Sequence, residues 1–186
     1  MVFMKGKVII VSGPSGAGKG TIINSILSKH KDISFSTSYT TRKPRQGETH
    51  GIHYHFIDKN SFEELISKND MLEWNKYADN YYGTRKSDVE NIINSGKSII
   101  IEVDVNGFNN LKSKLNNIIS IFICPPSLAI LRERLINRGT EEKDVIEKRL
   151  KRAEEEINYV HLYKHTITNN NLKDSIDEFE SILSKN

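Results

Sequence analysis

The chain has 186 residues, of which 37% are hydrophobic and 27% charged. This composition is typical of one soluble globular domain, and the net charge of +3 is too small to indicate a nucleic-acid partner. The single cysteine, Cys124, excludes an internal disulfide, and its apolar neighbours predict a buried packing thiol. No apolar run reaches the length of a membrane span or of a signal-peptide core. We therefore expect a cytoplasmic protein with no membrane contact. We also predict no obligate protein partner.

The first predicted element is an apolar strand over residues 8–11, followed by the stretch GPSGAGKGT (13–21) and an amphipathic helix over 21–31. Strand, glycine loop and helix in this order are the context of a phosphate-binding loop, whose backbone N–H groups point at phosphate oxygens. Lys19 would add a full positive charge for the β and γ phosphates. The alternative is a glycine-rich turn that binds no ligand.

One position of this loop departs from the usual pattern G-x-x-x-x-G-K-[ST]. The residue after the lysine normally carries a hydroxyl that faces a magnesium ion, but here it is Gly20, which has no side-chain oxygen. The first hydroxyl is that of Thr21, one position later. Either Thr21 contributes its hydroxyl, or Mg²⁺ is held mainly by phosphates and water. A GTPase that grips its metal through loop and switch residues would lose more by this change than a kinase whose Mg²⁺ arrives with ATP. The irregularity favours a kinase, with Mg²⁺ as its cofactor.

Residues 36–86 fit an alternation of strands and helices poorly, and we expect them to form an inserted small mixed α/β region. The strand-like HYHFI (53–57) would place His53 and His55 on one face, although no further metal ligand is suggested. Within STSYTTRKPRQGE (36–48), Arg42 and Arg45 flank a proline. Two fixed guanidinium groups suit a doubly charged phosphate, while the alternative is a pair of solvated surface arginines.

The rest of the chain alternates between helices and apolar strands. SDVENIINSG is expected to begin at a capping box formed by Ser87 and Glu90 and to end at Gly96. Continuous apolar runs are typical of strands covered on both faces of a parallel sheet, so the fold class is α/β with a doubly wound parallel sheet. The strands are expected at 98–104, 118–124 and 166–168, and the other helices at 127–139, 141–160 and 172–185.

We expect a core of residues 1–35, 87–126 and 160–186, with the insert at 36–86 and a helical lid at 127–159. The lid helix 141–160 would bury Val145, Ile146, Leu150, Ala153 and Ile157 on one side. Its charge run KRLKRAEEE (148–156) also suits a solvated face with Glu/Lys pairing, which is our interpretation of Lys148, Lys151 and Arg152.

Several strings, in chain order, resemble the guanylate kinase family. They are GPSGAGKGT, STSYTTRKPRQGE, Gly51 to Tyr54, LEWNKYADNYYGT (72–84), PPS (125–127), RLINRGTE (134–141) and KRLKRAEEE, and they cover nearly the whole chain. The resemblance implies a P-loop nucleoside monophosphate kinase that transfers the γ-phosphoryl group of ATP to GMP, and also to dGMP, in purine nucleotide metabolism.

The resemblance also implies roles for single residues. The ATP site would consist of Gly13, Pro14, Ser15, Gly16, Ala17, Gly18, Lys19, Gly20, Thr21 and Asn169, with Thr21 as the candidate metal ligand. Arg42, Arg45, Tyr54 and Tyr82 would bind the GMP phosphate, Glu73, Ser38 and Thr84 the guanine, and Asp104 would complete the acceptor site. The catalytic residues would be Lys19, Arg42, Arg134, Arg138 and Arg149.

The chemistry of Glu73 fits its implied role independently. A carboxylate only accepts hydrogen bonds, so it suits the adjacent donors of guanine, N1–H and the exocyclic amine, and repels the N1 lone pair of adenine. The alternative is a solvent-facing glutamate on a strand. No catalytic base is required, because the attacking group is already a phosphate oxyanion and catalysis rests on positioning and charge neutralisation. Closure of the lid would exclude water.

The sequence is compatible with three rival functions. A GTPase is favoured by DVNG (104–107), which fits D-x-x-G, but the guanine-reading N-K-x-D is missing: NKYAD (75–79) has the wrong spacing and lies upstream. A kinase for AMP, UMP or dTMP is disfavoured by Glu73 and TTRKPR. A non-catalytic scaffold of the same fold is disfavoured because the lysine and the arginines all remain.

Overall fold

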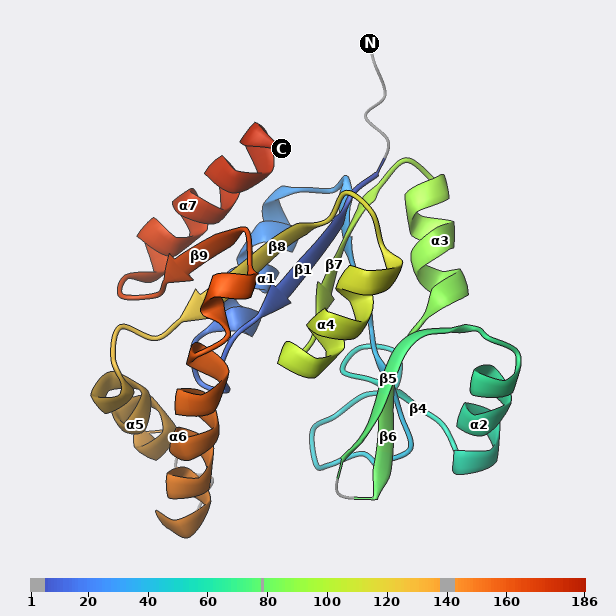
Figure 1. The fold of residues 1–186 in the computed structure, drawn as a ribbon, viewed down its shortest axis with the longest axis horizontal. Coiled ribbons are helices and arrows are strands. Elements are labelled where there is room, and N and C mark those ends of the chain that lie inside the picture. Colours follow the sequence, from blue (N-terminus) through green and yellow to red (C-terminus); the bar gives the residue numbers. More distant parts are fainter. Residues whose placement is uncertain (1–5, 78, 138–142) are drawn as a thin grey trace. The chain divides into compact units, whose positions relative to one another are not determined.

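The computed structural model describes residues 6–77, 79–137 and 143–186. Five strands form one sheet in the order β2 (Ile33–Phe35), β7 (Ser98–Glu102), β1 (Val8–Ser12), β8 (Ile119–Cys124) and β9 (His165–Thr168) (Figure 1). The pairs β2–β7, β1–β8 and β8–β9 run parallel. Ile10, Ile100 and Ile121 are 0% exposed, as expected of strands covered on both faces. The predicted α/β class with a parallel sheet is confirmed.

The chain divides into two compact units. The first contains residues 6–8, 32–101 and 106–118, and the second contains residues 9–31, 102–105 and 119–186. The domain boundaries expected from the sequence stay a prediction. In the part of the chain that the structure describes, no helix is both long and apolar enough to span a membrane.

The second unit carries the helices that follow the glycine loop and the last strands. They are α1 (Lys19–Lys29), α5 (Leu128–Asn137), α6 (Lys143–Ile157), the short 3₁₀ helix η1 (Val160–Leu162) and α7 (Leu172–Lys185). α7 has the bounds expected from the sequence, whereas α1 begins and ends two residues before its expected bounds. α5 begins one residue later than expected and α6 ends three residues earlier, and their expected bounds between them fall on residues 138–142, which lie outside the described residues. Cys124 is half-buried at the end of β8, where burial raises the pKa of its thiol.

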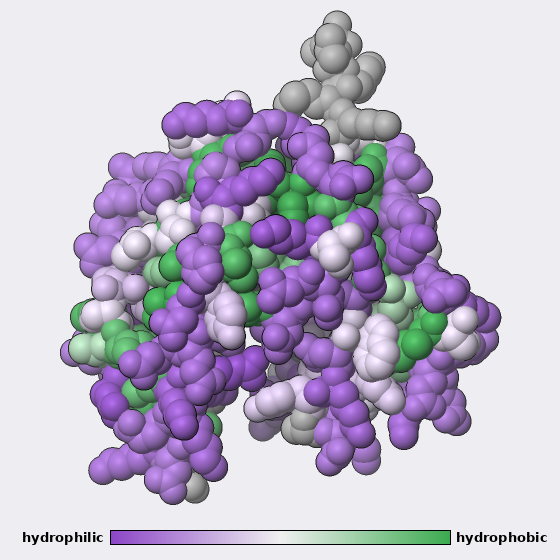
Figure 2. Space-filling view, viewed as in Figure 1, coloured by the Kyte–Doolittle hydropathy of each residue, from purple (hydrophilic) through white to green (hydrophobic). Residues whose placement is uncertain are grey.

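A small apolar cluster joins α5 and α6. Leu131 and Leu135 of α5 pack in it with Ile146, Leu150 and Ala153 of α6. Val145, which we expected on the same side, is 40% exposed, because a residue adjacent to Ile146 is rotated by about 100° around the helix axis. The remaining surface of α6 is charged, and the region is strongly hydrophilic in Figure 2.

The first unit contains a four-stranded mixed sheet in the order β4 (His55–Phe56), β3 (Tyr39–Thr40), β6 (Asn80–Arg85) and β5 (Met71–Tyr77). β3 pairs in parallel with β4, and β6 pairs antiparallel with β3 and β5. The strand expected over 53–57 was too long. His53 precedes β4 in a turn, where its Nδ1 accepts the N–H of Thr49 at 3.0 Å, so His53 and His55 do not share a strand face.

Three helices complete this unit: α2 (Lys59–Ser67), α3 (Lys86–Asn94) and α4 (Val105–Lys114), of which Val105 belongs to the second unit. The capping box expected at Ser87 is wrong, since α3 begins at Lys86 and Ser87 lies inside it. The carboxylate of Asp70 instead accepts the N–H of Ser87 at 3.0 Å, so a residue outside the helix supplies the cap. Neither α4 nor β2 was predicted.

Candidate nucleotide-binding sites

The glycine loop of the second unit has a backbone that requires glycine. Gly13, Gly16 and Gly18 have φ angles of 143°, 92° and 97°, values that side chains rarely tolerate. A Cβ on Gly13 would lie 2.1 Å from the carbonyl oxygen of Ile123, so β8 approaches the loop too closely for any other residue. Ala17, buried at 0% exposure, donates its N–H to the carbonyl of Pro14 at 3.1 Å. The loop is therefore held in a defined curve at the start of α1.

Lys19 is the first residue of α1, and its side chain folds back over the loop. Its Nζ donates to the carbonyls of Gly13 at 2.6 Å and Pro14 at 3.1 Å, and lies 3.6 Å from a carboxylate oxygen of Glu102. A lysine beside the positive end of a helix is suited to bind phosphate anions. Glu102 was missed from the sequence. The feature that could have indicated Glu102 as a site residue is its position as an acidic residue at the end of the buried strand 98–102.

A groove of about 540 Å³ lies beside the loop. It is lined by Gly16, Gly18, Thr21, Arg134, Asn137, Asn169, Asn170 and Leu172. The buried Asn169 amide donates to the carbonyl of Ala17 at 2.7 Å, and its side-chain oxygen accepts the Ser175 hydroxyl at 3.1 Å. Arg134 donates to the Asn169 carbonyl at 2.8 Å. The structure thus brings together the loop, Thr21, Arg134 and Asn169.

The chemistry of the loop region suits a magnesium ion that arrives with phosphates. Among the described residues, no group of three or more His, Cys, Asp or Glu side chains could hold a metal ion by itself. Hard-donor side chains at the loop include the hydroxyl of the exposed Thr21 and the Glu102 carboxylate beside Lys19. These residues fit a cation whose ligands are supplied mostly by phosphates and water.

Helix α6 brings two arginines to the end of the parallel strands. Arg149 donates to the hydroxyl of Ser15 in the glycine loop at 3.1 Å. Arg152, which we expected only on a solvated face, lies 3.2 Å from a carboxylate oxygen of Asp104 and 2.8 Å from one of Glu156. Arg138, another predicted catalytic residue, lies outside the described residues. Asp104 belongs to the second unit, unlike the other residues predicted to bind GMP.

In the first unit, Arg42 is the centre of a polar and aromatic cluster. Its two terminal nitrogens donate to the two carboxylate oxygens of Glu48, each at 2.9 Å. The guanidinium carbon lies 5.5 Å from the ring centre of Tyr54, whose ring meets that of Tyr82 edge-on at 6.1 Å. Arg45 is exposed and donates its backbone N–H to Glu48 at 2.7 Å. Four residues predicted to bind a phosphate are thus placed in one neighbourhood.

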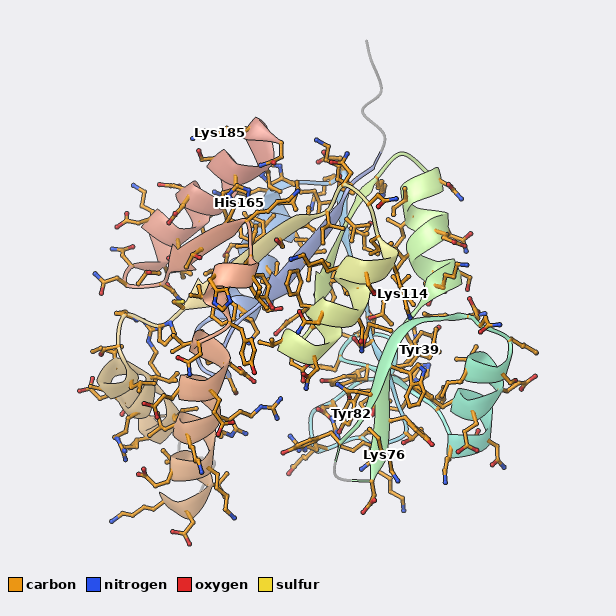
Figure 3. The ribbon with its side chains drawn as sticks, viewed as in Figure 1. Tyr39, Lys76, Tyr82, Lys114, His165 and Lys185 are labelled. Atoms are coloured by element: carbon orange, nitrogen blue, oxygen red, sulfur yellow. The ribbon has the colours of Figure 1, made fainter. Side chains whose placement is uncertain are left out.

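Glu73 and Thr84 form a buried polar pair across β5 and β6. Glu73 is 4% exposed and Thr84 0%, and the threonine hydroxyl donates to the carboxylate at 2.8 Å. The alternative of a solvent-facing glutamate is therefore wrong. Thr84 and Tyr82 are two residues apart on β6 and so share a face of the sheet. Figure 3 labels Tyr82 on this strand and Tyr39 on β3.

Ser38 lies directly before β3, and its carbonyl accepts the N–H of His55 at 2.8 Å. Its side chain is half-buried, and its role toward a base stays a prediction.

A parallel α/β sheet whose first strand leads through a glycine loop to a lysine at a helix N-terminus defines the class of P-loop nucleotide-binding proteins. Comparison with known proteins narrows this class. The family model described as guanylate kinase matches residues 5–186. The chain belongs to the guanylate kinase family.

Individual relatives agree with this placement. The guanylate kinase of Clostridium perfringens strain SM101 is 45% identical over 96% of this chain and 83% of its own length. That of Clostridium tetani is 43% identical over 97% of this chain and 86% of its own length. The crystal structure of guanylate kinase from Anaplasma phagocytophilum superposes with a TM-score of 0.77 at 29% identity, covering 97% of this chain and 85% of that one.

Proposed function

We propose that the protein is an ATP:GMP phosphotransferase that converts ATP and GMP into ADP and GDP, and that it also accepts dGMP in purine nucleotide metabolism. The choice of GMP as the acceptor rests on the buried Glu73–Thr84 pair, in the sheet whose strand β3 leads into the bend that contains Arg42. A buried carboxylate aligned by a hydroxyl is an acceptor for adjacent N–H donors, as guanine presents them. The cytoplasm, where both nucleotides are abundant, is the proposed location.

In the proposed reaction, an oxygen of the GMP phosphate forms a bond to the γ-phosphorus of ATP while the bond from that phosphorus to the β–γ bridging oxygen breaks. ADP leaves with that oxygen and its electron pair. No proton need be removed, because the attacking oxygen is already anionic. Catalysis then consists of aligning two anionic substrates and neutralising their charge.

The second unit supplies the proposed ATP site. Lys19 would exchange the carbonyls of Gly13 and Pro14 for phosphate oxygens, and the N-terminus of α1 adds partial positive charge. The groove beside Asn169 would receive the adenine. Arg134 and Arg149 are the proposed neutralisers of charge that develops during transfer, together with Arg138. Thr21 and Glu102 are the residues that would hold a Mg²⁺ ion bound with ATP, and the ion would supply further neutralisation of phosphate charge.

The first unit supplies the proposed GMP site. Arg42, Arg45, Tyr54 and Tyr82 would bind the phosphate, since guanidinium groups and phenol hydroxyls are donors that match phosphate oxygens. Glu73 and Thr84, with Ser38, would read the base.

The test is ADP formation from Mg·ATP with GMP, dGMP, AMP, UMP or dTMP, and without acceptor. We expect ADP with GMP and dGMP only, and loss of activity by orders of magnitude in Lys19→Ala, because the loop then lacks its positive charge. Equal activity with another base would contradict the role of Glu73. Steady ADP formation without acceptor would indicate a hydrolase, and ATP binding without turnover would indicate a scaffold.

A further inference from the structure

The carboxylate of Glu48 links the two ends of the segment from Arg42 to Glu48 through hydrogen bonds. Glu48 accepts two hydrogen bonds from the terminal nitrogens of Arg42, each at 2.9 Å, and a third from the backbone N–H of Arg45 at 2.7 Å. The N–H of Glu48 in turn donates to the carbonyl of Arg45 at 3.0 Å. One side chain therefore fixes the guanidinium of the first arginine and the backbone of the second.

Further contacts hold the Arg42 guanidinium in this orientation. Its Nη1 also donates to the carbonyl of Lys43 at 2.8 Å, and its carbon atom lies 5.5 Å and 5.7 Å from the ring centres of Tyr54 and Phe56. The side chains of Arg42 and Glu48 are only 15% and 18% exposed. The guanidinium is thus fixed at its end by Glu48, and its carbon atom lies over two aromatic rings.

The charge of Glu48 is stable at every physiological pH. The hydrogen bonds from Arg42, and after them the one from the Arg45 backbone, lower the pKa of Glu48 to about 2. The same partner raises the pKa of Arg42. The contact is therefore a permanent ion pair, and it does not act as a pH switch.

A guanidinium has five N–H donors. Glu48 and the Lys43 carbonyl accept hydrogen bonds from both hydrogens of Nη1 and from one of Nη2. Tyr82 also interacts with the Arg42 side chain. The edge formed by Nε–H and the second Nη2–H is therefore the edge that, beside Tyr82, suits another anion in bidentate fashion. Glu48 thereby selects which edge of Arg42 is presented. A free arginine would have to lose its rotamer freedom at the moment of binding.

Resting on the proposed GMP site, we infer that Glu48 is a positioning residue for the acceptor phosphate: it presents the Nε edge of Arg42 and fixes the loop of Arg45 before GMP binds. The opposite effect is also physically available, because a carboxylate beside Arg42 offsets part of the positive charge that attracts the phosphate. The bidentate geometry, the third bond to Arg45 and the low exposure favour positioning over competition.

Glu48→Gln separates the two effects. The amide has the same shape but one acceptor oxygen, and its NH₂ group faces the donors of Arg42 or Arg45. We expect the KM for GMP to rise about tenfold or more, since a hydrogen bond to a charged group is worth at least this factor. The KM for ATP should stay within about twofold, because the ATP site lies on other residues.

The matched control is Glu64→Gln, which removes an exposed carboxylate on α2 that pairs with Lys68 at 2.6 Å in the same unit. It should leave the KM for GMP unchanged. A fall of the KM for GMP in Glu48→Gln would show that Glu48 competes with the phosphate, and an unchanged KM would show that it has no role there; either overturns the inference. If wild type and Glu64→Gln also fail to phosphorylate GMP, the proposed function itself has failed.

A double-mutant cycle tests whether Glu48 acts through Arg42. In the Arg42→Gln background, Glu48→Gln should raise the KM for GMP by less than about threefold, because the side chain that it orients is gone. An equal factor in both backgrounds would contradict the inference. If Glu48→Gln does not fold, Glu48→Asp keeps the charge but is too short to reach both arginines at once. Its KM for GMP should then lie between those of wild type and Arg42→Gln; a wild-type value would contradict the inference.

Discussion

Glu73 is the residue whose burial most limits what the protein can bind. At 4% exposure it needs hydrogen-bond donors, and Thr84 supplies one at 2.8 Å. A ligand that offers further N–H groups adds hydrogen bonds to the carboxylate, whereas a ligand that offers a lone pair places two acceptors against each other in a buried site. The base selection that we propose for Glu73 would therefore arise from the penalty for the wrong partner as much as from attraction to the right one.

Glu73→Gln should reduce discrimination between GMP and IMP, which lacks the exocyclic amine. The glutamine amide keeps one acceptor but turns a donor toward the base, so kcat/KM for GMP should fall by about 10- to 100-fold and the GMP-to-IMP ratio should shrink. Parallel assays of both acceptors, with Glu64→Gln as control, measure this. A ratio that stays at the wild-type value would mean that another residue reads the amine.

At the residue scale, the sequence was most informative where chemistry depends on neighbours along the chain. The glycine loop with Lys19 follows from one local pattern, and its P-loop class is confirmed. Glu48 stood inside a quoted motif, yet its bonds to Arg42 and Arg45 could not be predicted, because they depend on side-chain directions. Glu102 and the partner of Arg152 were missed because each ion pair joins residues distant in sequence.

At the scale of elements, continuous apolar runs predicted β1, β7 and β8 well, since burial on both faces leaves a clear signal. The sequence of helix α4 carries only a weak helical signal. Its sequence VNGFNNLKSK contains a glycine and three asparagines, which are poor helix formers, and its helical state rests on the burial of Val105, Phe108 and Leu111. The capping of α3 by Asp70 is likewise a tertiary contact, not a local pattern.

The stability of the region formed by β3, β4 and α3 is expected to depend on pH through His55. His55 stacks on Tyr39 with 4.5 Å between ring centres and meets His50 at 5.4 Å, while Tyr39 donates to Asp88 at 2.9 Å. Burial lowers the pKa of His55, with Asp88 opposing this and His50 and Arg85 adding to it. The unfolded chain, with a histidine pKa of about 6.5, therefore binds the proton more readily than the folded one.

The free energy of unfolding should accordingly decrease as the pH falls from about 7 through 6.5 toward the lower folded pKa of His55, and be constant in this respect above pH 7. Urea titrations of wild type and His55→Gln at several pH values measure the effect, and the variant should have the shallower slope. His161→Gln, at an exposed histidine of the second unit, is the control. A slope unchanged by His55→Gln would exclude this coupling.

At the scale of the whole molecule, the two compact units divide the proposed substrates between them. The loop and the groove belong to the second unit, and the Arg42 cluster with the Glu73–Thr84 pair belongs to the first. The sequence placed these motifs in order along the chain, but which residues gather into each compact unit depends on contacts between segments far apart in sequence. The unit assignment of α4 shows this most clearly.

This division predicts separate footprints in hydrogen exchange. A ligand that binds only the folded state raises the free energy of unfolding by about 2.7 kcal/mol at a hundredfold excess over its Kd, and this slows hydrogen exchange at the amides that it stabilises. GMP alone should slow exchange in residues 38–56 and 71–85, and a non-hydrolysable ATP analogue alone should slow it in 13–21 and 169–172. A footprint of GMP restricted to the glycine loop would contradict the proposed assignment of the sites.

Gly20, the irregular position of the glycine loop, is a residue that the fold allows to change. Apart from its two chain neighbours and the backbone of its own helix, no described residue places a heavy atom within 4 Å of the point where a Cβ on Gly20 would stand. Gly20 also lies within α1, where an ordinary side chain is favoured by up to about 1 kcal/mol over glycine. A serine would thus fit without rearrangement, and the fold leaves this hydroxyl free to be gained or lost by drift, whereas Gly13, pressed against β8, admits no substitute.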